Sequence, residues 1–211
     1  MLTLGEELLI LSIEDGKGAL TPFTSETLRY GLAGAILADL ALQEKVILEK
    51  SRLALVDPTS TADPILDEAI AALAKENKPR KVIHWINSMG SKKLSRKIFK
   101  NLSEKGVLRS EEHRYAWVIP YEADSLLNAS AKYWLKTRLR KVVLAGEEPE
   151  LRMVLLLSLL RACRLLNLVF TRDERSEAGR QVGELVKGET IGEAVAYVIK
   201  KIETAASSAD G

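Results

Sequence analysis

The 211-residue sequence is poor in the residues that most often carry chemistry. It holds a single cysteine, Cys163, so no disulfide can form within the chain, and its apolar neighbours are typical of a buried, inert thiol in a reducing compartment. The two histidines, His84 and His113, lie far from each other and from Cys163, without the spacing of metal ligands. The sequence therefore predicts no metal site and no cofactor.

Catalytic and nucleotide-binding patterns are also missing. The sequence has no P-loop, no GxGxxG and no GxSxG. The nearest approach to paired catalytic carboxylates is Glu6-Glu7, but adjacent residues of a helix point to different faces and cannot share one site. We therefore predict that the chain is not an enzyme.

Long apolar runs without charges are absent too. The longest apolar stretch, 151–170, contains Arg152, Arg161 and Arg164. A bilayer-spanning helix of about 20 residues would not carry arginines near its centre without a large penalty. This stretch is instead predicted to be a core helix that Glu148-Pro149 begins.

The residues that are present favour helices. Aromatic residues make up only 5% of the sequence, whereas Leu, Ala, Lys and Glu abound, which is typical of helices packed on helices. Apolar spacing and end signals predict helices near 4–13, 25–43, 64–76, 79–90, 91–105, 123–144 and 149–170, with two more before the C-terminus. Capping boxes at Thr3–Glu6 and Thr190–Glu193 mark the starts of the first and last helices.

Two short segments have the alternation of strands rather than helices. One predicted β-hairpin lies within 45–58 and turns at 49–51, and the second lies within 107–121 around a polar turn at 110–114. No repeat and no linker divides the chain. The sequence therefore predicts a mainly α-helical single domain over 1–203, with one or two small β-hairpins and a frayed tail over 204–211.

Charge is unevenly distributed in a chain whose formal net charge is only +2. Residues 1–77 hold 6 basic and 13 acidic side chains, whereas residues 78–109 hold 10 basic side chains and one acid. A second basic cluster follows at helical spacing: Lys132, Lys136, Arg138, Arg140 and Lys141. Positive charge concentrated in the middle of a nearly neutral chain predicts an anionic partner there.

The stretch at 91–108 combines much of this charge with a helical apolar pattern. Its sequence, SKKLSRKIFKNLSEKGVL, predicts a basic amphipathic helix that Gly106 ends before a short strand. A phosphate group favours several donors that converge on one point. Lys92, Ser95 and Arg96 are side chains of the types that bind phosphate.

Three interpretations of this helix follow from the residues alone. The first is an anionic membrane surface, to which each lysine or arginine near the surface contributes about 1 kcal/mol. The second is nucleic acid, because a basic helix, a glycine and a hairpin follow one another as in a winged helix. Lysines are point charges rather than bidentate readers of bases, which counts against nucleic acid as the partner. The third is a solvated helix face without a ligand.

Four fragments of the sequence occur together in an order that resembles the Golgi phosphoprotein 3 family. They are LTLGEELLILSIEDGKG at 2–18, GLAGAILADLAL at 31–42, LDEAIAAL at 66–73 and KNLSEKGVL at 100–108. The resemblance covers nearly the whole chain and implies a mostly α-helical single domain with a β-hairpin. It also implies a non-enzymatic adaptor, since eukaryotic members bind phosphatidylinositol 4-phosphate on the cytosolic face of the Golgi and help to retain glycosyltransferases.

The resemblance suggests where a lipid head group would bind. Eukaryotic members carry a tryptophan shortly before the glycine-rich helix and an arginine between its glycines, which correspond here to Thr24 and Ala33. Their two further arginines, three residues apart, correspond to Lys92 and Ser95. Arg29 lies four residues before Ala33 and therefore on the same helix face.

We therefore expect a relocated basic pocket that accepts an anionic phospholipid head group less selectively than arginine and tryptophan would. The candidate head-group residues are Thr24, Arg29, Lys92, Lys93, Ser95 and Arg96. The expected protein is cytoplasmic and peripherally associated with the cytosolic face of a membrane, where it organises the membrane or its traffic for a client membrane protein that the sequence does not name.

Two further expectations concern assembly and origin. The segment YAWVIPY at 115–121 matches the region through which family members self-associate, and Trp117, Ile119 and Tyr121 would alternate onto one face. A homo-oligomer is therefore plausible, and a self-associating scaffold without lipid specificity is an alternative function.

The chain begins directly at the first family fragment, as a compact prokaryotic-type member would, which argues against recognition of glycosyltransferase tails by an N-terminal arm.

Overall fold

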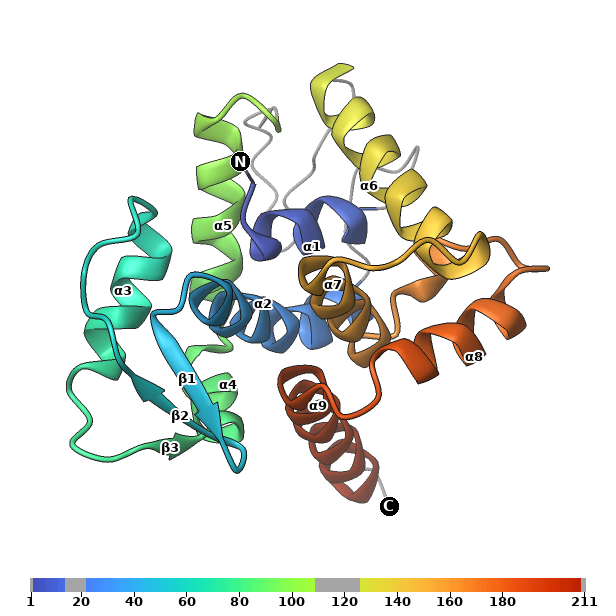
Figure 1. Ribbon diagram of the computed structural model, residues 1–211. Helices are drawn as coiled ribbons and strands as arrows, with labels where there is room; N and C mark the ends of the chain where they lie inside the picture. The colour runs from blue at the N-terminus through green and yellow to red at the C-terminus, as the bar shows by residue number, and fades with distance from the viewer. Residues whose placement is uncertain (1, 14–21, 109–125, 210–211) are drawn as a thin grey trace.

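A computed structural model describes residues 2–13, 22–108 and 126–209 of the chain (Figure 1). The described residues form helices around one core and a three-stranded antiparallel sheet at one side, which confirms the mainly α-helical fold expected from the sequence. The elements in chain order are α1 (Leu4–Ser12), α2 (Pro22–Leu42), β1 (Val46–Glu49), β2 (Arg52–Leu55), α3 (Pro64–Leu73), β3 (Arg80–Lys81), α4 (Val82–Met89), α5 (Lys92–Glu104), α6 (Leu126–Leu144), α7 (Leu151–Ala162), a short 3-10 helix η1 (Leu166–Leu168), α8 (Arg175–Leu185) and α9 (Thr190–Ala209).

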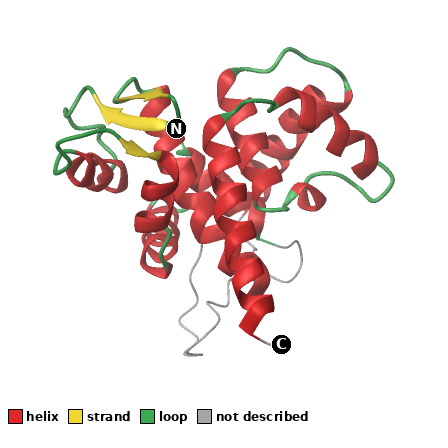
Figure 2. Ribbon diagram, turned by 90° about the horizontal axis from the view of Figure 1, so that it is seen from below, coloured by secondary structure: helices red, strands yellow, loops and turns green. Residues whose placement is uncertain are grey.

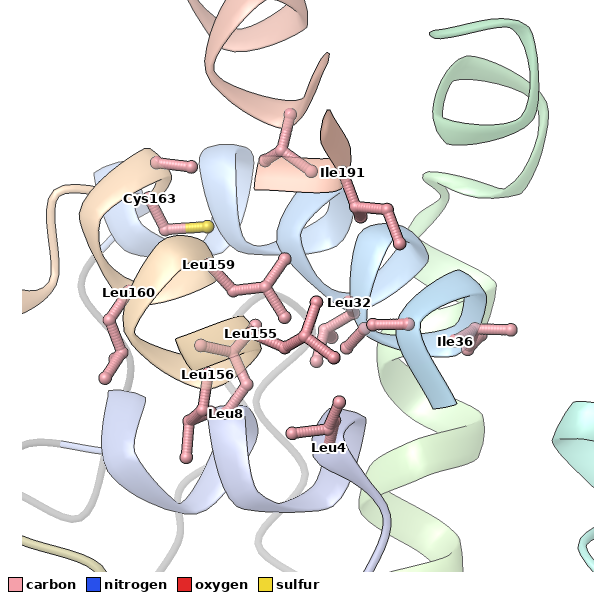
Figure 3. Packing of buried hydrophobic residues seen from close by; sticks show 14 of the residues in the cluster. Leu4, Leu8, Leu32, Ile36, Leu155, Leu156, Leu159, Leu160, Cys163 and Ile191 are labelled. Carbon is pink, nitrogen blue, oxygen red and sulfur yellow. The ribbon is translucent and has the colours of Figure 1, made fainter. Parts of the chain in front are cut away.

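Helix α2 is the centre of the core, with α1, α4, α5, α7 and α9 packed around it (Figures 1 and 3). Its glycines allow this close packing. A Cβ on Gly31 would lie 2.3 Å from Cys163 Sγ, and one on Gly34 would lie 2.6 Å from Val195 Cγ2. The two glycines therefore leave room for side chains of the neighbouring helices, and the expected burial of Cys163 is confirmed.

Signals at several element ends are confirmed by their hydrogen bonds. The Thr3 hydroxyl accepts from the Glu6 amide at 3.2 Å, and the Glu6 carboxylate accepts from the Thr3 amide at 2.9 Å, which completes the first capping box. The carboxylate of Asp63 accepts from the first amides of α3, with proline at the first helical position.

The sheet has the order β1-β2-β3, with the predicted hairpin formed by β1 and β2 (Figure 2). The third strand was not expected from the sequence. Arg80 and Lys81 pair with β2 instead of joining the next helix, so α4 begins at Val82 rather than at position 79. Position 107 onwards was expected to be a strand, but 107 and 108 form a bend and the rest of the second hairpin lies outside the described residues.

Two expectations near the C-terminus are wrong in detail. Helix α7 begins at Leu151 and ends at Ala162, because Arg164 adopts a left-handed backbone with φ of 59° that no α-helix continues through. The N-terminus of α9 is capped by Glu189, whose carboxylate accepts from two backbone amides at 2.6 and 2.8 Å, rather than by the Thr190–Glu193 pair. Helix α9 then continues to Ala209.

The apolar helix α7 lies in the core, as Figure 3 shows for Leu155, Leu156 and Leu159. Among the residues described, no helix is both long enough and apolar enough to cross a lipid bilayer. The domain boundaries expected at 203 and 204 remain a prediction.

Candidate functional site

Helix α5 owes its position to a cap, an apolar stripe and a glycine. The Ser91 hydroxyl accepts from the Leu94 amide at 3.2 Å and begins the helix. Leu94, Ile98 and Leu102 recur every four residues and are all buried, so this face packs against α1 and α2. Gly106 follows the helix with φ of 70°, as expected for a glycine that ends a helix.

The six basic residues of this segment divide into two groups. The three nearer its C-terminus meet carboxylates. Lys97 forms an ion pair with Glu68. Lys100 lies 3.3 Å from a carboxylate oxygen of Glu104, and Lys105 lies 2.6 Å from the buried carboxylate of Glu6. The three nearer its N-terminus are exposed, and within the described ranges no carboxylate oxygen lies within 4.0 Å of them. We call these residues the α5 cations: Lys92, Lys93 and Arg96.

The charge of the α5 cations at the start of the helix opposes the helix dipole. The N-terminus of a helix carries a partial positive charge and amides without an intrahelical acceptor, so acidic residues are favoured there. Acidic side chains do occupy the first turns of α1, α3, α8 and α9. The first turn of α5 instead carries Lys92 and Lys93 and no acid. Three cations and the free helix amides therefore meet at one exposed end, which suits an anion.

Arg29 approaches this end of α5 from α2. Its guanidinium lies 4.7 Å from the centre of the Tyr30 ring and donates to the Tyr30 hydroxyl at 2.8 Å. The same ring packs against Gly90, where an added Cβ would lie 2.5 Å from Tyr30 Cδ1. Gly90 directly precedes the cap of α5, so Tyr30 connects Arg29 to the helix that carries the α5 cations.

The remaining expected head-group residues are placed less informatively. Ser95 is half-buried, one turn after the Ser91 cap. Thr24 lies in α2, and its side chain falls outside what the structure describes. Ala33, which takes the position of the family arginine, is fully buried. It contributes nothing to a surface site.

The second basic cluster, on α6, is used within the fold. Arg140 makes two hydrogen bonds to Glu174, at 2.5 and 2.6 Å, and Arg138 lies 2.9 Å from Glu150. Lys141 lies 3.5 Å from Glu147, and Lys132 donates to the Ile13 carbonyl. The anionic partner that the sequence suggests for this region is therefore better sought at α5 than at α6.

Comparison with known proteins places the chain in a family. A model of the Golgi phosphoprotein 3 (GPP34) family matches residues 4–202. The chain belongs to this family. Vacuolar protein sorting-associated protein 74 of Eremothecium gossypii is 26% identical over 165 residues, which are 67% of this chain and 49% of that protein. The protein of the same name from Schizosaccharomyces pombe is 29% identical over 137 residues, which are 54% of this chain and 40% of that protein.

Membership in the Golgi phosphoprotein 3 family confirms the resemblance expected from the sequence. Proteins of this family are non-enzymatic adaptors, in agreement with the prediction that the chain is not an enzyme. In the described part of the chain, no group of three or more His, Cys, Asp or Glu side chains is arranged to hold a metal ion. The self-association residues expected from the family, Trp117, Ile119 and Tyr121, lie outside the described residues and remain a prediction.

Sequence reasoning missed one residue beside the site and one buried charge network elsewhere in the core. The first is Tyr30, whose only signal was its place directly after Arg29. The second is a buried charge network, in which Arg152 lies 3.1 Å from Glu7 and 3.3 Å from Asp39. An acid within the apolar stretch of α2 and an arginine at the start of α7 were the available signals for this network.

Burial changes the acidity of these carboxyl groups. Loss of hydration raises the pKa of Glu7 to about 7 and that of Asp39 to about 6, although the Arg152 guanidinium acts in the opposite direction on both. The carboxylate of Glu6, which precedes Glu7 in the chain, instead accepts hydrogen bonds from Lys105 and Asn101. Glu6 and Glu7 thus take part in different contacts, as their adjacent positions on a helix predict.

Proposed function

We propose that the protein is a peripheral membrane adaptor that binds anionic phospholipid head groups at the N-terminal end of α5. The observation that carries this proposal is the set of α5 cations, which the fold leaves exposed and without a carboxylate partner in the described residues. Neighbouring cations of the same helix are neutralised by Glu68, Glu104 and Glu6. The unneutralised charge is therefore concentrated at one end of the helix.

The energetics favour an anionic surface over isolated anions. Each basic residue near an anionic membrane contributes about 1 kcal/mol, so the α5 cations together contribute about 3 kcal/mol. The first amides of α5 add hydrogen-bond donors for a phosphate oxygen. Arg29, held against Tyr30, supplies a guanidinium on the adjoining helix.

Family membership supports the same class of ligand. The relatives are named for vacuolar protein sorting, and we propose a related role in membrane traffic on the cytosolic face of a membrane. The positions of the eukaryotic head-group residues hold Thr24, Ala33, Lys92 and Ser95 here. We therefore propose a phosphoinositide-like ligand, with phosphatidylinositol 4-phosphate as one candidate, bound by a relocated set of cations.

Flotation with liposomes tests this proposal. The wild-type protein should float with vesicles of phosphatidylcholine and an anionic phospholipid at physiological salt, and not with phosphatidylcholine alone. The variant Lys92→Glu/Arg96→Glu should stay at the bottom of the gradient. The control Arg172→Glu/Lys187→Glu reverses the same number of exposed cations on the α8 side of the molecule and should float like the wild type. Equal flotation of both variants would show that the α5 cations do not bind the membrane.

A further inference from the structure

The sheet carries a second group of exposed cations. Lys50 lies at the tip of the β1–β2 hairpin, and Arg52 of β2 lies directly opposite Lys81 of β3. All three are exposed, and in the described ranges no carboxylate oxygen lies within 4.0 Å of them. Like charges directly opposite each other on a sheet are destabilising. Glu49 of β1 lies opposite Arg52 on its other side, and the Arg52 guanidinium donates to the Pro79 carbonyl at 3.0 Å. Three cations and one acid leave an excess of positive charge on this part of the sheet, which an anionic surface would offset.

An exposed apolar side chain accompanies these cations. Ile47 alternates with the buried Val46 and pairs with Ala54, so it shares the outer face of the sheet with Arg52, Lys81 and the single acid Glu49. It is 44% exposed. Apolar and basic side chains on one exposed surface are the composition of segments that lie in a membrane interface.

The sheet is connected to the proposed head-group site by a helix without acids, α4. Figure 1 shows β3 leading directly into α4, which leads into α5. Helix α4 has eight residues, a length of about 12 Å. Its exposed side carries His84, Asn87 and Ser88, and the helix contains no carboxylate. An anionic membrane that contacts both the hairpin and α5 would therefore meet no negative charge on α4.

We propose that the β1–β2 hairpin and β3 form a second membrane contact, in which Lys50, Arg52 and Lys81 meet anionic head groups and Ile47 enters the interface. We call these four residues the hairpin patch. This inference rests on the proposed binding of anionic membranes at α5 and extends the contact from one helix end to a broader face. Charge complementarity selects the lipid surface as the occupant.

A fluorescent label at position 47 tests the contact directly. The native cysteine is 1% exposed and burial raises its pKa to about 12, so a maleimide dye will react selectively with an introduced thiol. An environment-sensitive dye on Ile47→Cys should brighten and shift to the blue when anionic vesicles are added. The same dye on Leu144→Cys, which replaces a 39% exposed residue at the end of α6, should not respond.

A charge variant provides an independent test without a label. Arg52→Gln/Lys81→Gln removes two cations worth about 1 kcal/mol each, so partitioning onto anionic vesicles should fall about 30-fold. Suppose that the wild type floats with anionic vesicles and the α5 variant Lys92→Glu/Arg96→Glu does not. If the dye at position 47 then shows no change in fluorescence and Arg52→Gln/Lys81→Gln partitions like the wild type, the hairpin contact alone is overturned. Absence of wild-type binding would overturn both proposals. A label response to duplex DNA only, or to protein concentration without vesicles, would assign the patch to nucleic acid or to a second copy instead.

Discussion

The substitution Lys93→Glu separates the binding role of α5 from its folding. Lys93 is the second residue of α5, where its charge opposes the helix dipole and where no hydrogen bond or ion pair with a described residue holds its side chain. Replacing an unfavourable cation with a favourable anion in the first turn should stabilise the fold by about 1 kcal/mol at low ionic strength. For a chain of this size, that corresponds to a rise in melting temperature of about 2–4 °C.

The same substitution should weaken membrane binding. Loss of one lysine removes about 1 kcal/mol, and the new carboxylate adds repulsion of similar size, so the partition coefficient should fall about 30-fold. Lys93→Gln should show about half of each free-energy change. Arg172→Glu, with the same change in charge on the α8 side, should leave vesicle binding unchanged.

The assays are differential scanning calorimetry and vesicle sedimentation on the same protein samples. Raising the salt from 0.1 to 1 M shortens the Debye length from about 10 to about 3 Å, so both effects should shrink together. A lower melting temperature of Lys93→Glu would contradict this prediction, since the helix end would then need its lysine for folding. Unchanged vesicle binding by a stabilised variant would remove Lys93 from the site.

Three further predictions concern the core. Gly34→Ala should destabilise the fold by about 1–3 kcal/mol in urea unfolding, because its Cβ would overlap side chains of α7 and α9, whereas Gly179→Ala, with open space around it, should be neutral or stabilising. Because the raised pKa values of Glu7 and Asp39 favour protonation in the folded state, stability should fall as the pH rises from about 4 to 7. Glu7→Gln should reduce that fall in melting temperature, and an unchanged pH profile would contradict this. The Cys163 thiol should react with Ellman's reagent only after denaturation, and rapid reaction of the native protein would show that it is accessible.

Much of the fold could be predicted because local signals and tertiary packing agree. The Thr3 capping box, the Asp63 cap and the Gly106 stop each satisfy backbone groups within a few residues, so a short sequence window contains the whole interaction. The glycines of α2 were also informative, since their only benefit in a helix is the space that they leave for neighbours.

The errors occur where distant residues decide the local structure. Arg80 and Lys81 form β3 because β2, almost 30 positions earlier, offers them an edge. Helix α7 ends at Ala162 although the apolar pattern continues, because the chain turns at Arg164 to pack η1 against it. Glu189 caps α9 with help from the Ser158 hydroxyl on α7, at 2.7 Å, a contact that sequence spacing does not contain.

The candidate site was predictable in composition but not in extent. The excess of cations at 78–109 was evident from the sequence, but which of them the fold neutralises depends on acids from α1 and α3. Only the structure divides the basic helix into a neutralised half and an exposed half. The opposition of Arg52 and Lys81 likewise depends on the strand register, which the sequence does not fix.

Backbone amide chemical shifts, measured by NMR during titration with a short-chain anionic phospholipid, directly test whether the head group binds at α5. We expect the largest changes at Ser91, Lys92 and Lys93, the cap and first turn of α5, and at Arg29, and we expect them to disappear in Lys92→Glu/Arg96→Glu. Changes centred on α6 and α8, or none up to saturating lipid, would contradict the assignment of the head-group site to α5.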